Sequence, residues 1–196
     1  MDAGQIVDHA CRLAGMEDDP TREIAWDFLR NRWSLVWNAY LWRTGLKTAT
    51  FGPDYYREFL TLPSVPEIVA EVSTDDSQYL PESDARPNMP RFTVSGATIM
   101  LYPPLPPGAS AFVRYKAPVA ELAETTLIPL PGGAECLLAF VTADLYEYMR
   151  QLAKSQAKLQ EAAALLERMK SVEVGQRSSS ATLIPHESVR WEEPYA

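Results

Sequence analysis

Histidine, cysteine and paired acidic residues are the side chains of this 196-residue chain that could bind a metal ion or transfer protons. His9 and Cys11 stand two positions apart on an expected helix, so their side chains point to different sides and cannot share a metal ion. His186 has Glu187 beside it but no cysteine or second histidine near enough to complete a metal site. The adjacent acidic pairs fall in expected caps, loops or the tail, where we expect solvated carboxylates: positions 18–19, 75–76 and 192–193.

Motifs for phosphate binding and nucleophilic catalysis do not occur in the sequence, which contains no GxGxxG, GxxxxGK[ST], GxSxG or HExxH. Residues 130–133 (LPGG) precede an expected helix, whose N-terminus could bind an anion. The glycine pattern and the lysine of a phosphate loop are missing, however, and a helix entry explains these four residues without a ligand. We therefore predict no enzymatic activity, no catalytic residue, no cofactor and no metal.

The composition indicates one globular domain with a hydrophobic core, because 46% of the residues are apolar and 22% are charged. The formal net charge of -8 argues against a protein that grips nucleic acid by its phosphates, which requires a basic patch. It is compatible with a protein that lets DNA slide past it. Cys11 and Cys136 lie among apolar residues on expected helices, so we predict buried, reduced thiols in preference to a disulfide.

No segment is expected to direct the chain into a membrane or a secretory route. The stretch richest in aromatic residues, WSLVWNAYLW at 33–42, is too short to cross a bilayer, which requires about 20 apolar residues. The first residues, MDAGQIVDH, carry acidic side chains where a signal peptide carries lysine or arginine.

Three helices are expected, at residues 2–14, 20–44 and 133–170. Asp2 is a good N-cap for the first helix, and Gly15 stands in its C-cap position. The second helix is expected to start at Asp19, with Pro20 at its first helical position, and to end near Gly45.

The second expected helix has two apolar sides when its residues are projected at 100° per residue. The first side consists of Trp26, Leu29, Trp33, Val36, Trp37, Tyr40 and Leu41, and the second of Ile24, Phe28, Leu35, Ala39 and Trp42. We expect the side of Trp33 and Trp37 to lie in the core of the chain. The side of Phe28, Leu35 and Trp42 is expected to be covered by the β insert or by an adjacent subunit. The alternative is a buried central helix in a monomer.

The third expected helix carries apolar residues at 3,4 spacing over about four heptads, which is typical of a coiled-coil seam. The seam consists of Leu138, Val141, Leu145, Tyr148, Leu152, Ser155, Leu159, Ala162, Leu166 and Met169. Its first half is expected to pack on the helices of the same chain. For the second half we favour pairing between subunits through Leu159 and Leu166, because a helix of about 38 residues would be about 57 Å long and exceed a domain of this size. A break near Ser155 would weaken that argument.

The region between the second and third helices is expected to form a small antiparallel β-sheet, an insert at about residues 48–120. Thirteen of the sixteen prolines fall between positions 53 and 131, a density that excludes long helices. Strand patterns occur at residues 57–63, 67–73, 91–95, 97–103 and 110–118. Ser95-Gly96 predicts a tight hairpin turn, and residues 73–90 a long exposed loop.

The last part of the sequence, residues 171–196, is expected to form an extended C-terminal arm. Its apolar residues are separated by polar ones, so it cannot bury enough surface to fold alone. We expect these apolar residues to dock on another molecule: Leu183, Ile184, Val189, Trp191 and Tyr195.

The order of these elements and four short phrases point to one family. The phrases are WNAYLW (37–42), LTLPSVPEIVAEV (60–72), IMLYPPLPPGASAFVRYKAPVAEL (99–122) and IPLPGGAECLLAFVTADLYEYM (128–149). With them, nearly the whole chain resembles the head-to-tail connector, or adaptor, proteins of tailed bacteriophages and related prophage elements. The resemblance implies an α+β fold with a helical body of two N-terminal helices and one long C-terminal helix, an inserted small antiparallel β-sheet and an extended C-terminal arm. The proline density of PPLPPG departs from the insert of that family.

The resemblance further implies a structural virion protein of the neck, assembled in the host cytoplasm. Its subunits would form a homo-oligomeric ring, commonly of about twelve copies, beneath the portal protein at the capsid vertex. The ring would extend the channel for double-stranded DNA, without binding DNA specifically, and dock a stopper or tail protein. Residues 1–170 would form a single adaptor domain, and the arm would contact the portal or a neighbouring subunit.

Three other readings remain open. The nearest is a stopper or another ring protein that completes the neck or tail, although such proteins are usually dominated by a barrel. The second is a non-viral helical module that binds a partner protein. The third is an enzyme, such as a wall-degrading activity of a particle, which would require a cleft with a perturbed carboxylate.

Overall fold

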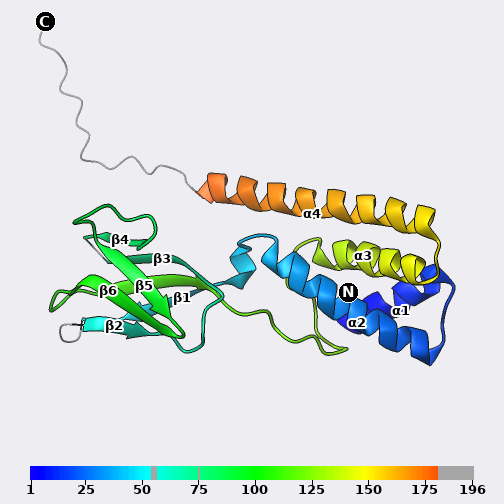
Figure 1. Cartoon of the computed structure of the whole chain (residues 1–196), viewed down its shortest axis with the longest axis horizontal. Coiled ribbons are helices and arrows are strands. Elements are labelled where there is room, and N and C mark those ends of the chain that lie inside the picture. Colours follow the sequence, from blue (N-terminus) through cyan, green and yellow to red (C-terminus); the bar gives the residue numbers. More distant parts are fainter. Residues whose placement is uncertain (54–56, 75, 181–196) are drawn as a thin grey trace, which may run out of the picture.

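The computed structural model describes residues 1–53, 57–74 and 76–180, which form two bodies, a helical bundle and a curled β-sheet (Figure 1). The bundle contains α1 (Ala3–Ala14), α2 (Asp19–Asn38), α3 (Gly133–Tyr148) and α4 (Leu152–Ser180), and the short 3-10 helix η1 (Arg43–Gly45) leads from α2 into the sheet. The strands are β1 (Leu46–Phe51), β2 (Arg57–Thr61), β3 (Ile68–Thr74), β4 (Gln78–Pro81), β5 (Arg91–Ser95), β6 (Thr98–Leu105) and β7 (Ala111–Lys116). Each body has a hydrophobic cluster of its own, and the two clusters share no described residue.

Helix α1 begins and ends where the sequence predicts. The carboxylate of Asp2 accepts a hydrogen bond from the backbone N–H of Gln5, and the side-chain oxygen of Gln5 accepts one from the N–H of Asp2. Gly15 follows the helix with a φ of 75°, a left-handed conformation that glycine adopts without steric cost. The buried side of α1 contacts α2 and α3.

Helix α2 begins as expected but ends well before Gly45, so the predicted C-terminal boundary is wrong. Its N-cap is Asp18, whose carboxylate accepts hydrogen bonds from the N–H and the hydroxyl of Thr21. The last helical residue is Asn38, and the chain then turns through Trp42 into η1.

The early end of α2 has a tertiary cause. The backbone carbonyl of Val36 accepts a hydrogen bond from the indole N–H of Trp42 at 2.9 Å. The carbonyl of Trp37 accepts one from Nζ of Lys116, which belongs to β7, also at 2.9 Å. These carbonyls would bond to the next helical turn if α2 continued, so side chains from outside the helix take the place of that turn.

The single long C-terminal helix of the prediction is also wrong, because the chain turns back on itself between α3 and α4. Arg150 adopts a left-handed conformation with a φ of 59°. The N–H of Gln151 donates to the carbonyl of Tyr146, and the N–H of Arg150 donates to that of Glu147. This is a Schellman motif, which usually has glycine where Arg150 stands. Because α4 packs along α3, the two halves of the predicted seam lie on neighbouring helices of one bundle, and the C-terminal part of α4 continues past the end of α3 (Figure 1).

The sheet is larger than predicted and mixed, so the expectation of a small inserted antiparallel sheet is wrong. It has seven strands in the order β1-β7-β3-β4-β5-β6-β2 within the described residues. The central pair, β4 and β5, is parallel, and the other neighbours are antiparallel. Strands β1 and β4 were not expected, and β4 lies inside the predicted long loop at 73–90. The Ser95-Gly96 turn is confirmed as the link between β5 and β6.

One face of the sheet encloses the second hydrophobic cluster. Strands alternate their side chains between two faces, and six of the strands or their ends contribute to the same cluster. Its buried members are Leu60, Leu62, Val72, Tyr79, Phe92, Ile99, Leu101, Leu105, Ala111, Val113 and Tyr115. The sheet therefore curls around its own core, and no described helix contributes a residue to that cluster.

The core of the bundle contains the tryptophans of α2. Trp33 is 2% exposed and Trp37 is 5% exposed, which confirms that this side of α2 faces the core of the chain. Their rings contact each other with centroids 5.2 Å apart. Arg32 on α2 and Asp144 on α3 form a bidentate ion pair that links the two helices, with Arg32 Nε to Asp144 Oδ2 at 2.7 Å.

Candidate interaction surfaces

The predicted interface residues on α2 lie in three different environments. Leu35 is 60% exposed on the outside of the bundle, where it is free to contact another molecule. Phe28 is half-buried and packs against the bundle core. Trp42 is 2% exposed and belongs to that core, because the turn after Asn38 folds it back onto α2. Of the three residues, only Leu35 therefore presents most of its side chain to a neighbour.

The predicted interface residues on α4 face the bundle more than expected. Leu159 and Leu166 are both half-buried, and Leu166 packs against the bundle core. The second half of the predicted seam is thus partly covered by the same chain. The large exposed apolar residues of α4 are instead Leu152, Val172 and Val174.

The predicted arm lies largely outside the described residues. Helix α4 continues to Ser180, so the first ten residues of the expected arm are helical. Within this segment Glu173 is buried, and its carboxylate accepts a hydrogen bond from the N–H of Arg43 at 2.7 Å. The docking candidates Leu183, Ile184, Val189, Trp191 and Tyr195 are among residues 181–196, which are not described.

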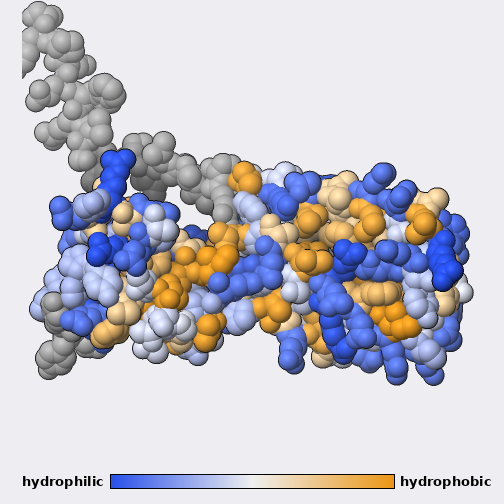
Figure 2. Space-filling model, viewed as in Figure 1, coloured by the Kyte–Doolittle hydropathy of each residue, from blue (hydrophilic) through white to orange (hydrophobic). Residues whose placement is uncertain are grey.

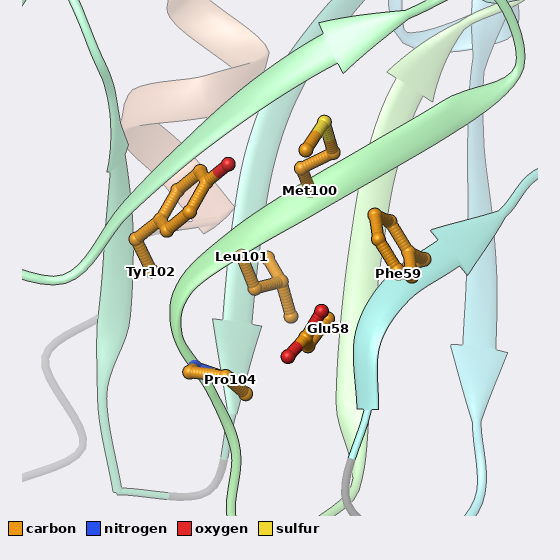
Figure 3. Close-up of a pocket in the computed structure, with 6 residues that line it drawn as sticks. All are labelled: Glu58, Phe59, Met100, Leu101, Tyr102 and Pro104. Atoms are coloured by element: carbon orange, nitrogen blue, oxygen red, sulfur yellow. The ribbon is translucent and has the colours of Figure 1, made fainter.

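The outer face of the sheet carries a small apolar hollow that the sequence analysis missed (Figure 3). Phe59 of β2 lies directly opposite Met100 of β6, and Tyr102 follows on the same side of β6. Phe59 is 52% exposed and Tyr102 is 40% exposed. The guanidinium of Arg91 stands 5.5 Å from the centre of the Tyr102 ring. The hollow lies beside β2, which ends the strand order of the sheet.

Apolar surface is therefore present on both bodies. Figure 2 shows it along the bundle, on the sheet and where the sheet meets the bundle. Further exposed residues on the sheet are Ile68, Val94 and Phe112. Clusters of exposed apolar side chains on a folded protein commonly mark contacts with other molecules.

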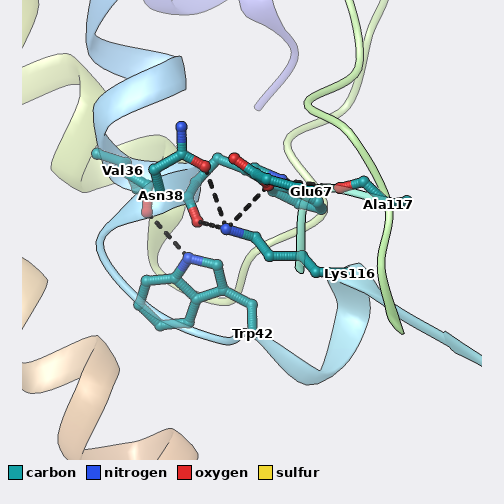
Figure 4. A network of polar contacts seen from close by, with 7 residues as sticks. Val36, Asn38, Trp42, Glu67, Lys116 and Ala117 are labelled. Carbon is teal, nitrogen blue, oxygen red and sulfur yellow. Dashed lines mark hydrogen bonds and ion pairs between the residues drawn. The ribbon is translucent and has the colours of Figure 1, made fainter. Parts of the chain in front are cut away.

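The two bodies meet at a polar network around Lys116 (Figure 4). Its Nζ donates to the carbonyl of Trp37 at 2.9 Å and to Oδ1 of Asn38 at 3.1 Å. It also forms an ion pair with Glu67 at 3.1 Å. Lys116 is 1% exposed, so this is a buried cation whose partners come from both bodies. Alternation along β7 places Lys116 on the outer face of the sheet, where a lysine is ordinarily solvated, so its burial could not be predicted from the strand pattern.

The thiols are buried and unpaired, as predicted. Cys11 is 4% exposed and Cys136 is fully buried, and neither forms a disulfide. Burial raises the pKa of Cys136 to about 11. The pKa of Cys11 is also raised, first by burial and then by the nearby carboxylate of Asp8. Both thiols therefore stay protonated at neutral pH.

The remaining chemical candidates do not converge on a site in the described part of the chain. His9 is exposed on α1, and His186 lies outside the described residues. Among the described residues, no three His, Cys, Asp or Glu side chains are placed to hold a metal ion. The same residues include no helix with both the length and the apolar composition to cross a bilayer.

No protein-family model matches the sequence, and no curated protein matches it.

Proposed function

We propose that this chain is a structural subunit of a bacteriophage neck, a head-to-tail adaptor that forms a ring beneath the portal. The observation that carries the proposal is the apolar surface on both bodies, with Leu35 of the bundle and Phe59 of the sheet each more than half exposed. A subunit in a ring contacts two neighbours through different patches, and further patches meet the components above and below. The order of helices, insert and tail in the sequence supports the same assignment.

The charge of the chain suits this role. A net charge of -8 is compatible with a channel wall that repels phosphates and lets double-stranded DNA pass without binding. The partners of the ring would be the portal on one side and a stopper or tail protein on the other. The role is structural, in the virion neck, and involves neither a cofactor nor a membrane.

The experiment mixes the purified full chain with the portal ring encoded in the same genome. Native mass spectrometry and electron microscopy would measure the mass and symmetry of the complex. We expect a closed ring of this chain on the portal. If the full chain does not bind the portal, the adaptor assignment is wrong, and a stopper or a helical protein-binding module becomes the better reading.

Two variants test how the ring forms. Leu35→Asp places a charge on the exposed side of α2 and is expected to abolish the ring while leaving the stability of the monomer unchanged. Leu127→Asp is the matched control, because Leu127 is 70% exposed on the linker before α3. If Leu35→Asp assembles as well as the control, Leu35 is not at the interface. A shortened chain that ends at Ser180 tests whether the residues beyond α4 bind the portal.

A further inference from the structure

The two bodies are joined at the C-terminal end of α2, which covers the outer face of β7 at its last residue, Lys116. Tyr115 points into the core of the sheet, so Lys116 points to the opposite face. That face is solvent-accessible at Arg114 but closed at Lys116, which is 1% exposed. The lysine therefore stands in the contact between the bodies.

Every proton donor of the Lys116 ammonium group has an acceptor. An ammonium carries three N–H groups, and three acceptors surround Nζ (Figure 4). Two of them, the Trp37 carbonyl and the Asn38 side chain, belong to the end of α2 in the bundle. The third, the carboxylate of Glu67, precedes β3 in the sheet. One side chain thus bonds to both bodies at once.

The position of the charge strengthens this contact. The C-terminal end of a helix carries a partial negative charge from its unpaired carbonyl groups, and a cation placed there is stabilised. Lys116 supplies that cation to α2, and its Nζ lies 5.7 Å from the centre of the Trp37 ring. Without the ammonium group, the Trp37 carbonyl would lose a partner at a position where Lys116 is 1% exposed, and Glu67, which water partly reaches, would lose its ion pair.

The two bodies could change their relative orientation without opening either hydrophobic cluster. Their hydrophobic clusters share no described residue, so a swing of one body against the other leaves both cores buried. The backbone bond from the N–H of Ala117 to the carbonyl of Gly45, at 3.1 Å, and the contact of the Trp37 indole N–H with the Ala117 carbonyl, at 3.4 Å, lie in the same junction. The hydrogen bond from the N–H of Arg43 in η1 to the buried carboxylate of Glu173 in α4 also lies at this junction. Lys116 alone contributes three of the polar contacts there.

We propose that this junction is a hinge and that Lys116 is the residue that locks it. With the lock intact the sheet and the bundle keep one orientation. When it is removed, both bodies stay folded but sample a range of angles. This inference concerns the single chain and stands independently of the ring assignment.

The test measures the distance between the two bodies in the full chain. Spin labels are attached through Ser95→Cys on the sheet and Ala163→Cys on α4, both exposed positions, while the native thiols are buried. Pulsed electron paramagnetic resonance gives the distance distribution. We expect one narrow distribution for the parent chain and a broad one for Lys116→Met, with an unchanged circular dichroism spectrum. Lys47→Met, an exposed lysine of β1, is the matched control and should stay narrow.

Hydrogen exchange is the second measurement, and it distinguishes a loosened hinge from a protein that is destabilised throughout. In Lys116→Met the amide of Ala117 should exchange its hydrogen about tenfold faster, while amides in the middle of α3 keep their protection. If Lys116→Met does not fold, Glu67→Ala and Asn38→Ala, combined in one chain, remove two of the three acceptors and decide the question. A folded variant with a distribution as narrow as that of the parent chain would overturn the inference.

Discussion

Replacing Gly45 by alanine probes the closest approach of the backbone to a buried ring. A Cβ atom at Gly45 would lie 2.8 Å from both Cζ2 and Cη2 of Trp37, far inside the ordinary contact distance. The ring cannot easily retreat, because it is 5% exposed and packs against Trp33 on one side. Gly45→Ala therefore forces Trp37 or the chain at η1 to shift.

The expected change in the free energy of unfolding follows from two opposing effects of Gly45→Ala. Overpacking a well-filled site costs about 1–3 kcal/mol. Replacing glycine by alanine also restricts the unfolded chain, which stabilises the folded state by about 0.4–1 kcal/mol. The net expectation for Gly45→Ala is a loss of up to about 2.5 kcal/mol in the free energy of unfolding. The second effect acts alone at Gly52, where an added Cβ would meet nothing within 4 Å. Gly52→Ala should therefore leave the stability unchanged or raise it by up to about 1 kcal/mol.

The assay is urea denaturation followed by tryptophan fluorescence. Four of the five tryptophans, at positions 26, 33, 37 and 42, belong to the bundle or to the turn after α2, so the signal reports on this body. The difference between Gly45→Ala and Gly52→Ala removes the shared entropy contribution. If Gly45→Ala is as stable as Gly52→Ala, the contact with the Trp37 ring does not constrain the junction.

Three further predictions concern the bundle. Asp144→Ala should lower the free energy of unfolding by about 2–4 kcal/mol in urea denaturation, because it leaves Arg32 largely buried without its partner. The ion pair with Asp144 also raises the pKa of Arg32. Replacing both residues by apolar ones should recover most of the lost stability. Hydrogen bonds from α2 lower the pKa of the N-cap Asp18, so its contribution to stability is fully present above its ordinary pKa near 4 and is lost as the pH falls through the lowered value. Asp18→Asn should therefore flatten the acid limb of stability measured against pH, and an unchanged acid limb would contradict this role. Cys11 and Cys136 should not react with a thiol reagent at pH 8 in the native protein, but both should react as urea unfolds the bundle; fast native labelling would refute their burial.

The helix starts and the buried tryptophan side could be predicted because they depend on local chemistry. Asp2 and Gly15 mark the ends of α1 through hydrogen bonds and dihedral angles that involve only neighbouring residues. Likewise, the spacing of Trp33 and Trp37 places both on one side of any helix through them. These features do not depend on how the rest of the chain folds.

The helix boundaries that were predicted wrongly depend on distant residues or on an unusual residue in a turn. Helix α2 ends at Asn38 because Lys116, far along the chain, occupies one of its last carbonyl groups. The turn between α3 and α4 places Arg150 where glycine is usual, so no glycine or proline marks it in the sequence. The apolar spacing of α3 and α4 continues across this turn, which is why the two helices were predicted as one.

The local sequence pattern also did not predict the size of the sheet or the candidate interaction surfaces. Strand β4 has only four residues, and its parallel pairing with β5 joins segments separated by a loop. The hollow at Phe59 and Met100 depends on the register between β2 and β6, which no single strand specifies. Leu35 was predicted as an interface candidate from helical spacing alone, and among the candidates that lie in the described residues it is the one whose side chain is mostly exposed.

The insertion of the sheet between α2 and α3 has a consequence for synthesis of the chain. The strands span one continuous stretch, Leu46 to Lys116, whereas the bundle needs α1 and α2 together with α3 and α4. On the ribosome, therefore, the sheet can complete its core while the first two helices still lack their partners. Until residues 133–180 emerge, the apolar surfaces of α1 and α2 that α3 and α4 bury remain uncovered and are open to chaperones or to other nascent chains. The helical bundle, which contains the N-terminal helices, is thus the last part of the chain to complete its core.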